Sequence, residues 1–396
     1  MSILKVQKIR HTASNTDVVD IASDGTCRAN IVNNLSNRNL IINGAMQVAQ
    51  RSGSSTVAVS DGSNEGYQTI DRMHFSYGNS AAGAANISQA TDAPTTLGFT
   101  KSHKTDVTTV NSTSSGNGVI GIKYGIEGQD LRSSGWNHLS ASSYLTLSFY
   151  FKTTKTGTSK LPIMFRIYHG TAYYYVQNVT VTDPTNWNRY TVRLPGNSNL
   201  TINDLNTQAM AIFFSYQTGS DKDTNSEGAW GTTNAYSTSE STNYFDSTSN
   251  DMFITGIQLE VDHTGSGKPT DFEHRSYAQE LALCQRYYET SYPYGVAIGG
   301  NNSYTGMITQ SGSTNGSATM IVSVSWNEKR TTPTVTPYNP VNGNSGSWYA
   351  HRSGSTTHAS VTIDMISTRR CRLYFNVGAN WEASNAEGHV VVDAEI

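Results

Sequence analysis

The chain has 396 residues, of which 14% are charged and 36% are hydrophobic, and its formal net charge is −3. The 27 basic residues form no cluster, so we expect no nucleic-acid partner, because phosphate binding needs a basic stripe. No run approaches the ~18 apolar residues of a membrane span, and the N-terminus lacks the apolar core of a signal peptide. We therefore expect neither export through a signal peptide nor membrane insertion. The length predicts roughly two to three domains.

Cysteine usage and composition indicate a β protein made in the cytoplasm. Cys27, Cys284 and Cys371 are widely separated, fit no C-x-x-C pattern, and are odd in number, so we expect no disulfide framework. Polarity comes from Ser, Thr, Asn and 34 Gly, and the chain contains 22 Tyr. Tyr and Thr favour strands and Gly favours turns, so this composition predicts many short strands.

Residues 1–38 are expected to form a separate N-terminal arm. Asp24-Gly25 lies between two short apolar runs, and an Asp-Gly pair is a strong signal for a two-residue hairpin turn. Because a lone hairpin is marginal in water, the arm either needs a partner or is a flexible terminus.

Residues 39–275 contain the clearest strand patterns. In "YLTLSFYFKTT" the apolar residues Leu145, Leu147, Phe149 and Phe151 alternate with other side chains. The same alternation recurs in "LPIMFRIYHG", "WNRYTVRL", "AMAIFFSYQT" and "DMFITGIQLEV". Strands with one apolar face and no intervening helices predict an antiparallel sandwich of jelly-roll type.

The long segment 217–250 interrupts this series and is rich in aromatic residues. Loops of this length are usually functional or disordered. Exposed aromatic rings can stack on sugars while loop polar groups bind hydroxyls. Core packing or a subunit contact explains the same residues equally well. The candidate glycan contacts are Trp230, Tyr236 and Tyr244, with Tyr174 after a predicted turn at 169–171.

The same loop carries side chains with oxygen ligands at alternate positions, as the start of a calcium-binding loop does. Its candidate ligands are Asp221, Asp223, Asn225 and Glu227. The calcium pattern fails further on, where Ser226 replaces Gly and Thr232 replaces Glu, so a polar surface loop is the simpler interpretation. Loop carboxylates could also serve glycan hydrolysis, but their separation cannot be read from sequence. No H-E-x-x-H or G-x-S-x-G motif occurs, and we expect no enzyme activity and no cofactor.

Residues 276–292 are predicted to form a helical joint, a short helix that connects the two β domains. Ser276 and Gln279 form a capping box that predicts a helix start, and Pro293 marks its latest end. Such a short helix is not stable alone, so its apolar face must be covered by the sandwich or by neighbouring subunits. The residues expected on that face are Tyr277, Leu281, Cys284 and Tyr288.

Residues 293–396 contain further strand-like runs, including "ATMIVSVSW", "HASVTIDMI" and "CRLYFNVG". They predict a second, smaller β domain. The fold class is therefore all-β: a jelly-roll-like antiparallel sandwich, one short helix, and a C-terminal β domain.

Three blocks of the sequence resemble one protein family. They are "NLIINGAMQVAQRSG", "DRMHFSYG" and "ITGIQLEVDHTGSGKPTDFEHRSYAQELALCQRYYETS". Together they are similar to bacteriophage tail-fibre and virion structural proteins, and the FEHRSY…CQRYY part is the specific one. The chain departs from the family at Met73, where Trp is usual, and at Asp262-His263, where Gly is usual.

The resemblance implies a homotrimer in the virion tail, whose N-terminal arm contacts other tail proteins. The sandwich then resembles a carbohydrate-binding module, with a host surface glycan as partner. The expected function is that of a non-enzymatic adhesin that attaches the virion to its host. A purely structural tail component and a glycan-depolymerising tailspike are the alternatives.

Overall fold

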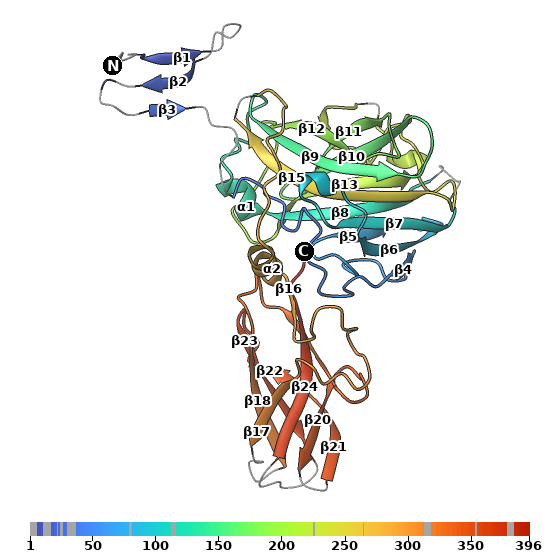
Figure 1. Ribbon diagram of the computed structural model, residues 1–396, viewed down its shortest axis with the longest axis vertical. Helices are drawn as coiled ribbons and strands as arrows, with labels where there is room; N and C mark the ends of the chain where they lie inside the picture. The colour runs from blue at the N-terminus through green and yellow to red at the C-terminus, as the bar shows by residue number, and fades with distance from the viewer. Residues whose placement is uncertain are drawn as a thin grey trace.

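The computed structural model describes residues 6–10, 17–21, 23, 27–29, 37–78, 81–111, 116–224, 226–263, 265–312, 318–352, 355–377 and 384–396. Figure 1 shows a small N-terminal sheet, a broad sandwich and a narrow C-terminal domain along the long axis. The pairs of strands are antiparallel, and the α-helices of the described part are α1 (Gly128–Ser133) and α2 (Tyr277–Gln285). The predicted all-β fold is confirmed.

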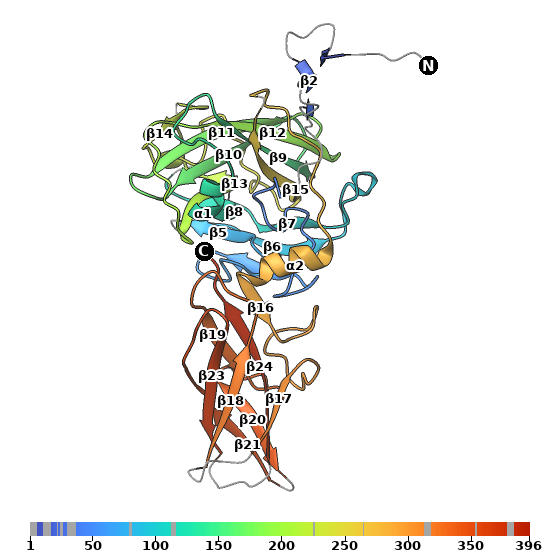
Figure 2. The ribbon, with the colours of Figure 1, turned by 90° about the vertical axis from the view of Figure 1, so that its left-hand side faces the viewer.

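The N-terminal sheet has the strand order β1-β2-β3. Its strands are β1 (Lys8–Arg10), β2 (Asp17–Ile21) and β3 (Cys27–Ala29). Strands β2 and β3 pair in the register of a hairpin, but the expected turn at Asp24-Gly25 lies outside the described residues. The sheet lies beyond the sandwich, on the side away from the C-terminal domain (Figures 1 and 2).

The sandwich consists of two six-stranded sheets, with the orders β14-β11-β10-β13-β8-β5 and β12-β9-β15-β7-β6-β4. The strands of the first sheet are β5 (His74–Gly78), β8 (Val119–Glu127), β10 (Ser159–Ile167), β11 (Tyr173–Val181), β13 (Gln208–Thr218) and β14 (Trp230–Gly231). Those of the second are β4 (Val57–Ser60), β6 (Ala84–Ala90), β7 (Ser102–Thr109), β9 (Tyr144–Thr153), β12 (Asn188–Pro195) and β15 (Asp251–Asp262). Short 3₁₀ turns lie at Thr95–Leu97 and Ser220–Lys222.

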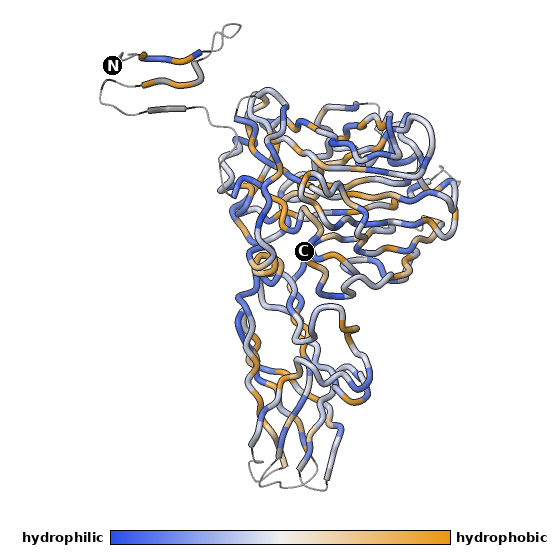
Figure 3. Tube along the Cα trace, viewed as in Figure 1, coloured by the Kyte–Doolittle hydropathy of each residue, from blue (hydrophilic) through white to orange (hydrophobic). Residues whose placement is uncertain are grey.

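The core lies between these sheets and follows the alternation seen in the sequence. Figure 3 shows hydrophobic and hydrophilic residues alternating along the strands. The predicted inward residues of β9 and β10 are fully buried: Leu145, Leu147, Phe149, Phe151, Leu161, Ile163, Phe165 and Ile167. Across the two sheets, the rings of Phe149 and Phe214 meet edge to face at 5.1 Å. Burial of these side chains supplies the main stabilising free energy of the sandwich.

Residues 219–250 lie against the sandwich over much of their length. Part of this segment covers the outer face of the first sheet, where it encloses a second, smaller core. The members of that core are Val119, Met164, Tyr174, Val176, Phe213 and Ala235, with Ala172 and Tyr236 packed beside them. Residues on both faces of β11 are therefore buried, one face by the main core and the other by this cover.

Helix α2 begins at the predicted capping box. The Ser276 hydroxyl accepts a hydrogen bond from the Gln279 backbone N–H, and the Gln279 side chain accepts one from the Ser276 N–H. The helix ends at Gln285, well before Pro293. Residues after it form β16 (Tyr288–Thr290), which pairs with β24 (Ser384–Asp393) in the C-terminal domain.

The apolar face predicted for this helix is therefore only partly correct. Cys284 and Tyr288 are buried, but Tyr288 belongs to β16. Leu281 is half-buried, and Tyr277 is 47% exposed. The buried side of the helix instead includes Glu280, whose carboxylate accepts a hydrogen bond from the Asn43 backbone N–H.

The C-terminal domain is built around β24. The other strands of this domain are β17 (Ile308–Gly312), β18 (Thr319–Ser325), β19 (Thr334–Tyr338), β20 (Ser347–Arg352), β21 (Ser355–Ser360), β22 (Thr362–Asp364) and β23 (Arg370–Asn376). β24 pairs with β16, β17, β19 and β20, while β18, β23 and β22 form a separate sheet. The core between them includes Trp348, Leu373 and Val392.

Buried charges join the two domains where β24 ends. Arg72, which is 1% exposed, forms an ion pair with Glu395 and donates to the Gly125 backbone oxygen at 2.8 Å. The Arg72 guanidinium also lies 3.5 Å from the centre of the Tyr287 ring. No helix in the described ranges is long and apolar enough to cross a membrane.

Candidate functional site

The aromatic residues predicted to contact a ligand lie in different surroundings. Trp230 is half-buried in β14, where its indole N–H donates to the Pro195 backbone oxygen at 2.8 Å. Tyr236 is also half-buried, and it meets Phe213 edge to face at 5.1 Å on the outer face of the first sheet. Of these two residues, only Trp230 reaches across toward the second sheet.

Two of the predicted glycan contacts are buried in the structure. Tyr244 is fully buried, and its hydroxyl lies 2.9 Å from that of Ser159. Its ring packs between Phe151 and Tyr216 in the main core. Tyr174 is 6% exposed beneath the 219–250 segment. The Tyr244 ring is closed off in the core, whereas Tyr174 lines a small cavity of about 120 Å³ together with Trp230.

The predicted cation ligands do not converge. The Asp223 carboxylate accepts a hydrogen bond from the Ser237 hydroxyl at 2.6 Å, and Asp221 is exposed. The Glu227 carboxylate accepts hydrogen bonds from the Gln177 side chain at 2.7 Å, the Asn178 backbone N–H at 2.8 Å and the Asn178 side-chain amide at 3.2 Å. The fourth candidate, Asn225, lies outside the described residues. The described part of the chain contains no cluster of three or more His, Cys, Asp or Glu suited to a metal.

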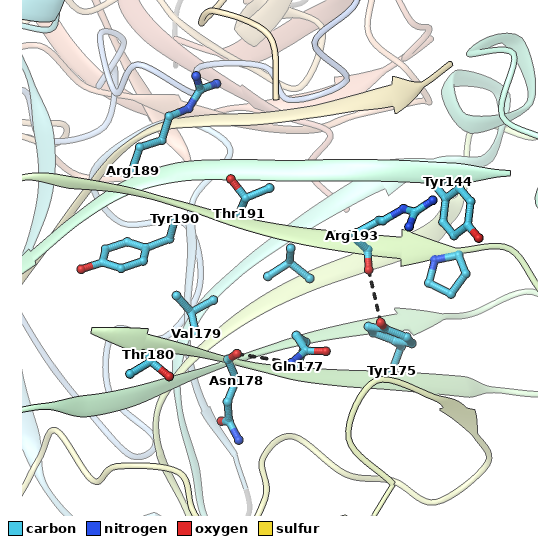
Figure 4. Close-up of a pocket in the computed structure, with 12 residues that line it drawn as sticks. Tyr144, Tyr175, Gln177, Asn178, Val179, Thr180, Arg189, Tyr190, Thr191 and Arg193 are labelled. Atoms are coloured by element: carbon cyan, nitrogen blue, oxygen red, sulfur yellow. Dashed lines mark hydrogen bonds between the residues drawn. The ribbon is translucent and has the colours of Figure 1, made fainter. Parts of the chain in front are cut away.

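A groove of about 700 Å³ opens where the edge strand β12 of one sheet faces β11 of the other (Figure 4). This volume lies in the range of sites for small molecules and oligosaccharide-sized ligands. The twelve lining residues are Tyr144, Tyr175, Gln177, Asn178, Val179, Thr180, Arg189, Tyr190, Thr191, Val192, Arg193 and Pro195. They carry phenol, amide, hydroxyl and guanidinium groups, and none of these twelve described residues is a carboxylate.

Two hydrogen bonds close one end of the groove. The Tyr175 hydroxyl donates to the Arg193 backbone oxygen at 3.2 Å, and the Trp230 indole donates to the Pro195 oxygen. Both carbonyls therefore point from β12 toward β11. Because alternate residues of a strand direct their backbone groups to the same edge, the N–H and C=O of Thr191 point into the groove as well.

The interior of the groove combines apolar and aromatic surface. Val179 and Val192 supply the apolar part of the lining, and Tyr190 lies near Val179 in Figure 4. Tyr190 is half-buried, with its ring 6.0 Å from that of Phe149. Burial raises the pKa of both Tyr175 and Tyr190 above the usual phenol value. Their hydroxyls therefore remain neutral and can both donate and accept hydrogen bonds.

The 219–250 segment fixes the amides along β11. Glu227 binds Gln177 and Asn178, and the Gly228 backbone N–H donates to the Val176 oxygen at 2.8 Å. Gly228 has φ +74°, and a Cβ at this position would lie 3.2 Å from the Gln177 side-chain oxygen. These contacts hold one rim of the groove before any ligand arrives, which lowers the entropy cost of binding.

Sequence reasoning missed most of this site. It selected Tyr174, whereas its neighbour Tyr175 faces the groove, because adjacent strand residues point to opposite faces. One signal was present: Tyr175 and Gln177 share a strand face with the apolar Val179 and Val181. Polar groups on an otherwise apolar face indicate a place where the core opens to solvent.

Comparisons with known proteins give weak similarities. The sequence matches no protein-family model and no curated protein. Among solved structures it is similar to a putative sugar binding protein from Bacteroides thetaiotaomicron, with 9% identity, a TM-score of 0.32, and coverage of 57% of this chain and 100% of that one. It is similar to the enzymatically active domain of bacteriophage CBA120 tailspike protein 4, at 12% identity and a TM-score of 0.29, covering 57% of this chain and 22% of that one.

A third similarity is to a family 11 carbohydrate-binding module from Clostridium thermocellum, in complex with a β-1,3-1,4-mixed-linked tetrasaccharide. The identity is 12% and the TM-score 0.26, with coverage of 56% of this chain and 100% of that one. These scores are too low to support an inference about function. The function proposed below therefore rests on the groove and on the sequence blocks described above.

Proposed function

We propose that the protein is a non-enzymatic adhesin of a bacteriophage tail fibre, and that the groove between β11 and β12 binds a glycan of the host surface. The observation that carries the glycan part is the combination of the half-buried Tyr144 and Tyr190 with fixed amide and backbone hydrogen-bonding groups in one groove. Sugars have apolar ring faces and polar edges, and such a groove offers partners for both.

The absence of carboxylates from the described lining supports binding without hydrolysis. Glycan hydrolysis uses two carboxyl groups placed on either side of the bond that is cut. Acidic groups beside the groove already have partners: Glu227 binds the β11 amides, Asp262 accepts the Gly267 backbone N–H at 2.7 Å, and Asp183 accepts hydrogen bonds from the Asn186 side chain. A bound sugar would meet phenols, amides and guanidinium groups instead.

The place of the protein in a virion rests on the sequence blocks alone. They imply a trimer in the tail, with the N-terminal arm bound to other tail proteins. Several copies on one particle would let individually weak sugar sites hold a virion, because the later binding events become intramolecular.

Adsorption of virions tests this function. The purified full chain is added to cells of a bacterial strain that adsorbs virions carrying this protein, and the unadsorbed virions are counted. We expect a dose-dependent fall in adsorption, and a weaker effect for Tyr190→Ala at equal folded concentration. If the protein neither binds cells nor reduces adsorption, the structural alternative replaces the adhesin. Release of sugar from host polysaccharide would instead favour the depolymerising tailspike.

A further inference from the structure

Two arginines of β12 line the groove, and they differ in how many contacts their guanidinium groups already make within the protein. Arg189 and Arg193 lie on the same face of the strand, four residues apart. The Arg189 guanidinium donates to the Ser148 hydroxyl at 2.9 Å and to the Thr270 backbone oxygen at 2.5 Å. Figure 4 shows the Arg189 side chain directed away from Tyr190. Arg189 therefore has a structural role.

Arg193 is held in place but remains accessible. Its side chain is 38% exposed, and the guanidinium carbon lies 3.3 Å from the centre of the Tyr144 ring. The Asp262 carboxylate is 3.9 Å from the Arg193 Nε, is itself 3% exposed, and binds the Gly267 N–H. Asp262 thus lies on the Nε side, and more than a third of the Arg193 side chain remains exposed.

A glycine loop fits closely around the same side chain. Gly265 and Gly267 have φ +66° and +68°. A Cβ at Gly265 would lie 3.3 Å from the Arg193 Nη2, and one at Gly267 would lie 3.3 Å from its Cδ. Together with Tyr144, this loop limits the positions that the side chain can take. Arg193 therefore needs little ordering when a ligand binds.

We infer that the groove selects acidic glycans, and that Arg193 pairs with a carboxylate or phosphate carried by the sugar. This inference rests on the proposed function. The planar guanidinium can donate two parallel hydrogen bonds to either anion. The described lining holds no carboxylate. The Asp262 carboxylate lies 3.9 Å from the Arg193 Nε but is buried against the Gly267 N–H, and Glu227 is already bound by Gln177 and Asn178. Arg193 is then the specificity-determining residue of the groove.

The test uses probes that differ in charge alone. Oligogalacturonides and their methyl esters share one sugar ring, but only the acid form carries carboxylates. A phosphorylated and an unphosphorylated mannose oligosaccharide form a second pair of probes, which tests recognition of phosphate. Binding to the full chain is measured by calorimetry for the wild type, Arg193→Gln and Arg193→Lys. Arg132→Gln, which alters an exposed arginine of α1, is the matched control.

We expect wild type and Arg132→Gln to bind one acidic probe at least about tenfold more tightly than its neutral partner. The preference should decrease with added salt and vanish in Arg193→Gln, while Arg193→Lys should keep only part of it. Preference for the carboxylated or the phosphorylated probe identifies the anion. Equal binding of charged and neutral probes by wild type overturns the inference but leaves the adhesin intact. Binding to none of the probes also overturns it, and adsorption of virions then decides the proposed function separately.

Discussion

The hydroxyl of Tyr175 donates a hydrogen bond to the backbone oxygen of Arg193, 3.2 Å away, and so ties β11 to β12 across the open edge of the sandwich. The two strands are consecutive in the chain but belong to different sheets. This hydrogen bond therefore supports the shape of the groove and the stability of the fold together.

Removing this hydroxyl should affect both properties. We expect Tyr175→Phe to lower the free energy of unfolding by about 0.5–1.5 kcal/mol, the net contribution of one hydrogen bond, and to weaken glycan binding. Chemical denaturation and binding to host cells measure the two effects. Tyr304→Phe is the control, because the Tyr304 hydroxyl only contacts Asn302 in an exposed part of the C-terminal domain. Equal behaviour of the two variants would count against a role of Tyr175 in the groove.

Trp230 and Tyr236 offer a matched pair of aromatic residues in the same segment. We expect Trp230→Ala to weaken cell binding strongly, because it removes both the ring beside Tyr175 and the hydrogen bond to Pro195. Tyr236→Ala should keep cell binding, because Tyr236 packs against Phe213 on the other side of the sheet. Binding is compared at equal folded concentration, checked by circular dichroism. A larger loss for Tyr236→Ala would move the site to the outer face.

The buried ion pair between the domains should contribute far more to the free energy of unfolding than an exposed ion pair does. Arg72→Ala removes the ion pair with Glu395, the hydrogen bond to Gly125 and the contact with the Tyr287 ring, although Arg51 still pairs with Glu395. We expect a loss of about 3–5 kcal/mol in the free energy of unfolding. Arg369→Ala breaks a pair with Glu328 in which the side chains are 70% and 53% exposed, and it should cost less than about 1 kcal/mol. Denaturant titration compares them. Similar losses would show that the junction does not depend on Arg72.

Asp71 should make stability depend on pH. Burial raises its pKa from 3.8 to about 6, although Arg51 and Gln50 oppose the rise. The folded protein therefore holds this proton more tightly than the unfolded chain. The resulting stabilisation is complete below about pH 4 and is lost as pH rises through 6.

The variant Asp71→Asn isolates this contribution. Between pH 4 and 7 the wild type should lose on the order of 2–3 kcal/mol of unfolding free energy relative to Asp71→Asn, corresponding to about two pKa units. Urea denaturation at a series of pH values gives the two curves. Parallel curves would mean that Asp71 keeps an ordinary pKa in the folded protein.

The strands could be predicted from the sequence because their signal is local. Leu145, Leu147 and Phe149 alternate with other residues, and all three are buried in the core. The start of α2 was equally clear, because the capping box of Ser276 and Gln279 spans only four residues. Such features depend on near neighbours and need no knowledge of the pairing order.

The end of α2 and the groove depend on distant parts of the chain. Tyr288 leaves the helix because β16 pairs with β24, about a hundred residues further on. The groove exists because β12, at the edge of one sheet, faces β11 of the other sheet, which only the short edge strand β14 covers, and no local pattern predicts this arrangement. Choosing Tyr175 over Tyr174 required the register of β11, since a shift by one residue exchanges the two faces of a strand.

The pairing of β16 with β24 also determines how the molecule bears a mechanical load. The chain enters the C-terminal domain along β16 and leaves it along β24, so the two segments lie side by side next to the sandwich. Antiparallel hydrogen bonds run perpendicular to their strands. A load that enters at the far end of β24 and leaves through the start of β16 therefore shears the hydrogen bonds of this ladder together instead of opening them one at a time. Glu395 follows the end of β24, and its ion pair with Arg72 attaches this end to the domain that contains the groove. Part of the force therefore reaches that domain through the ion pair.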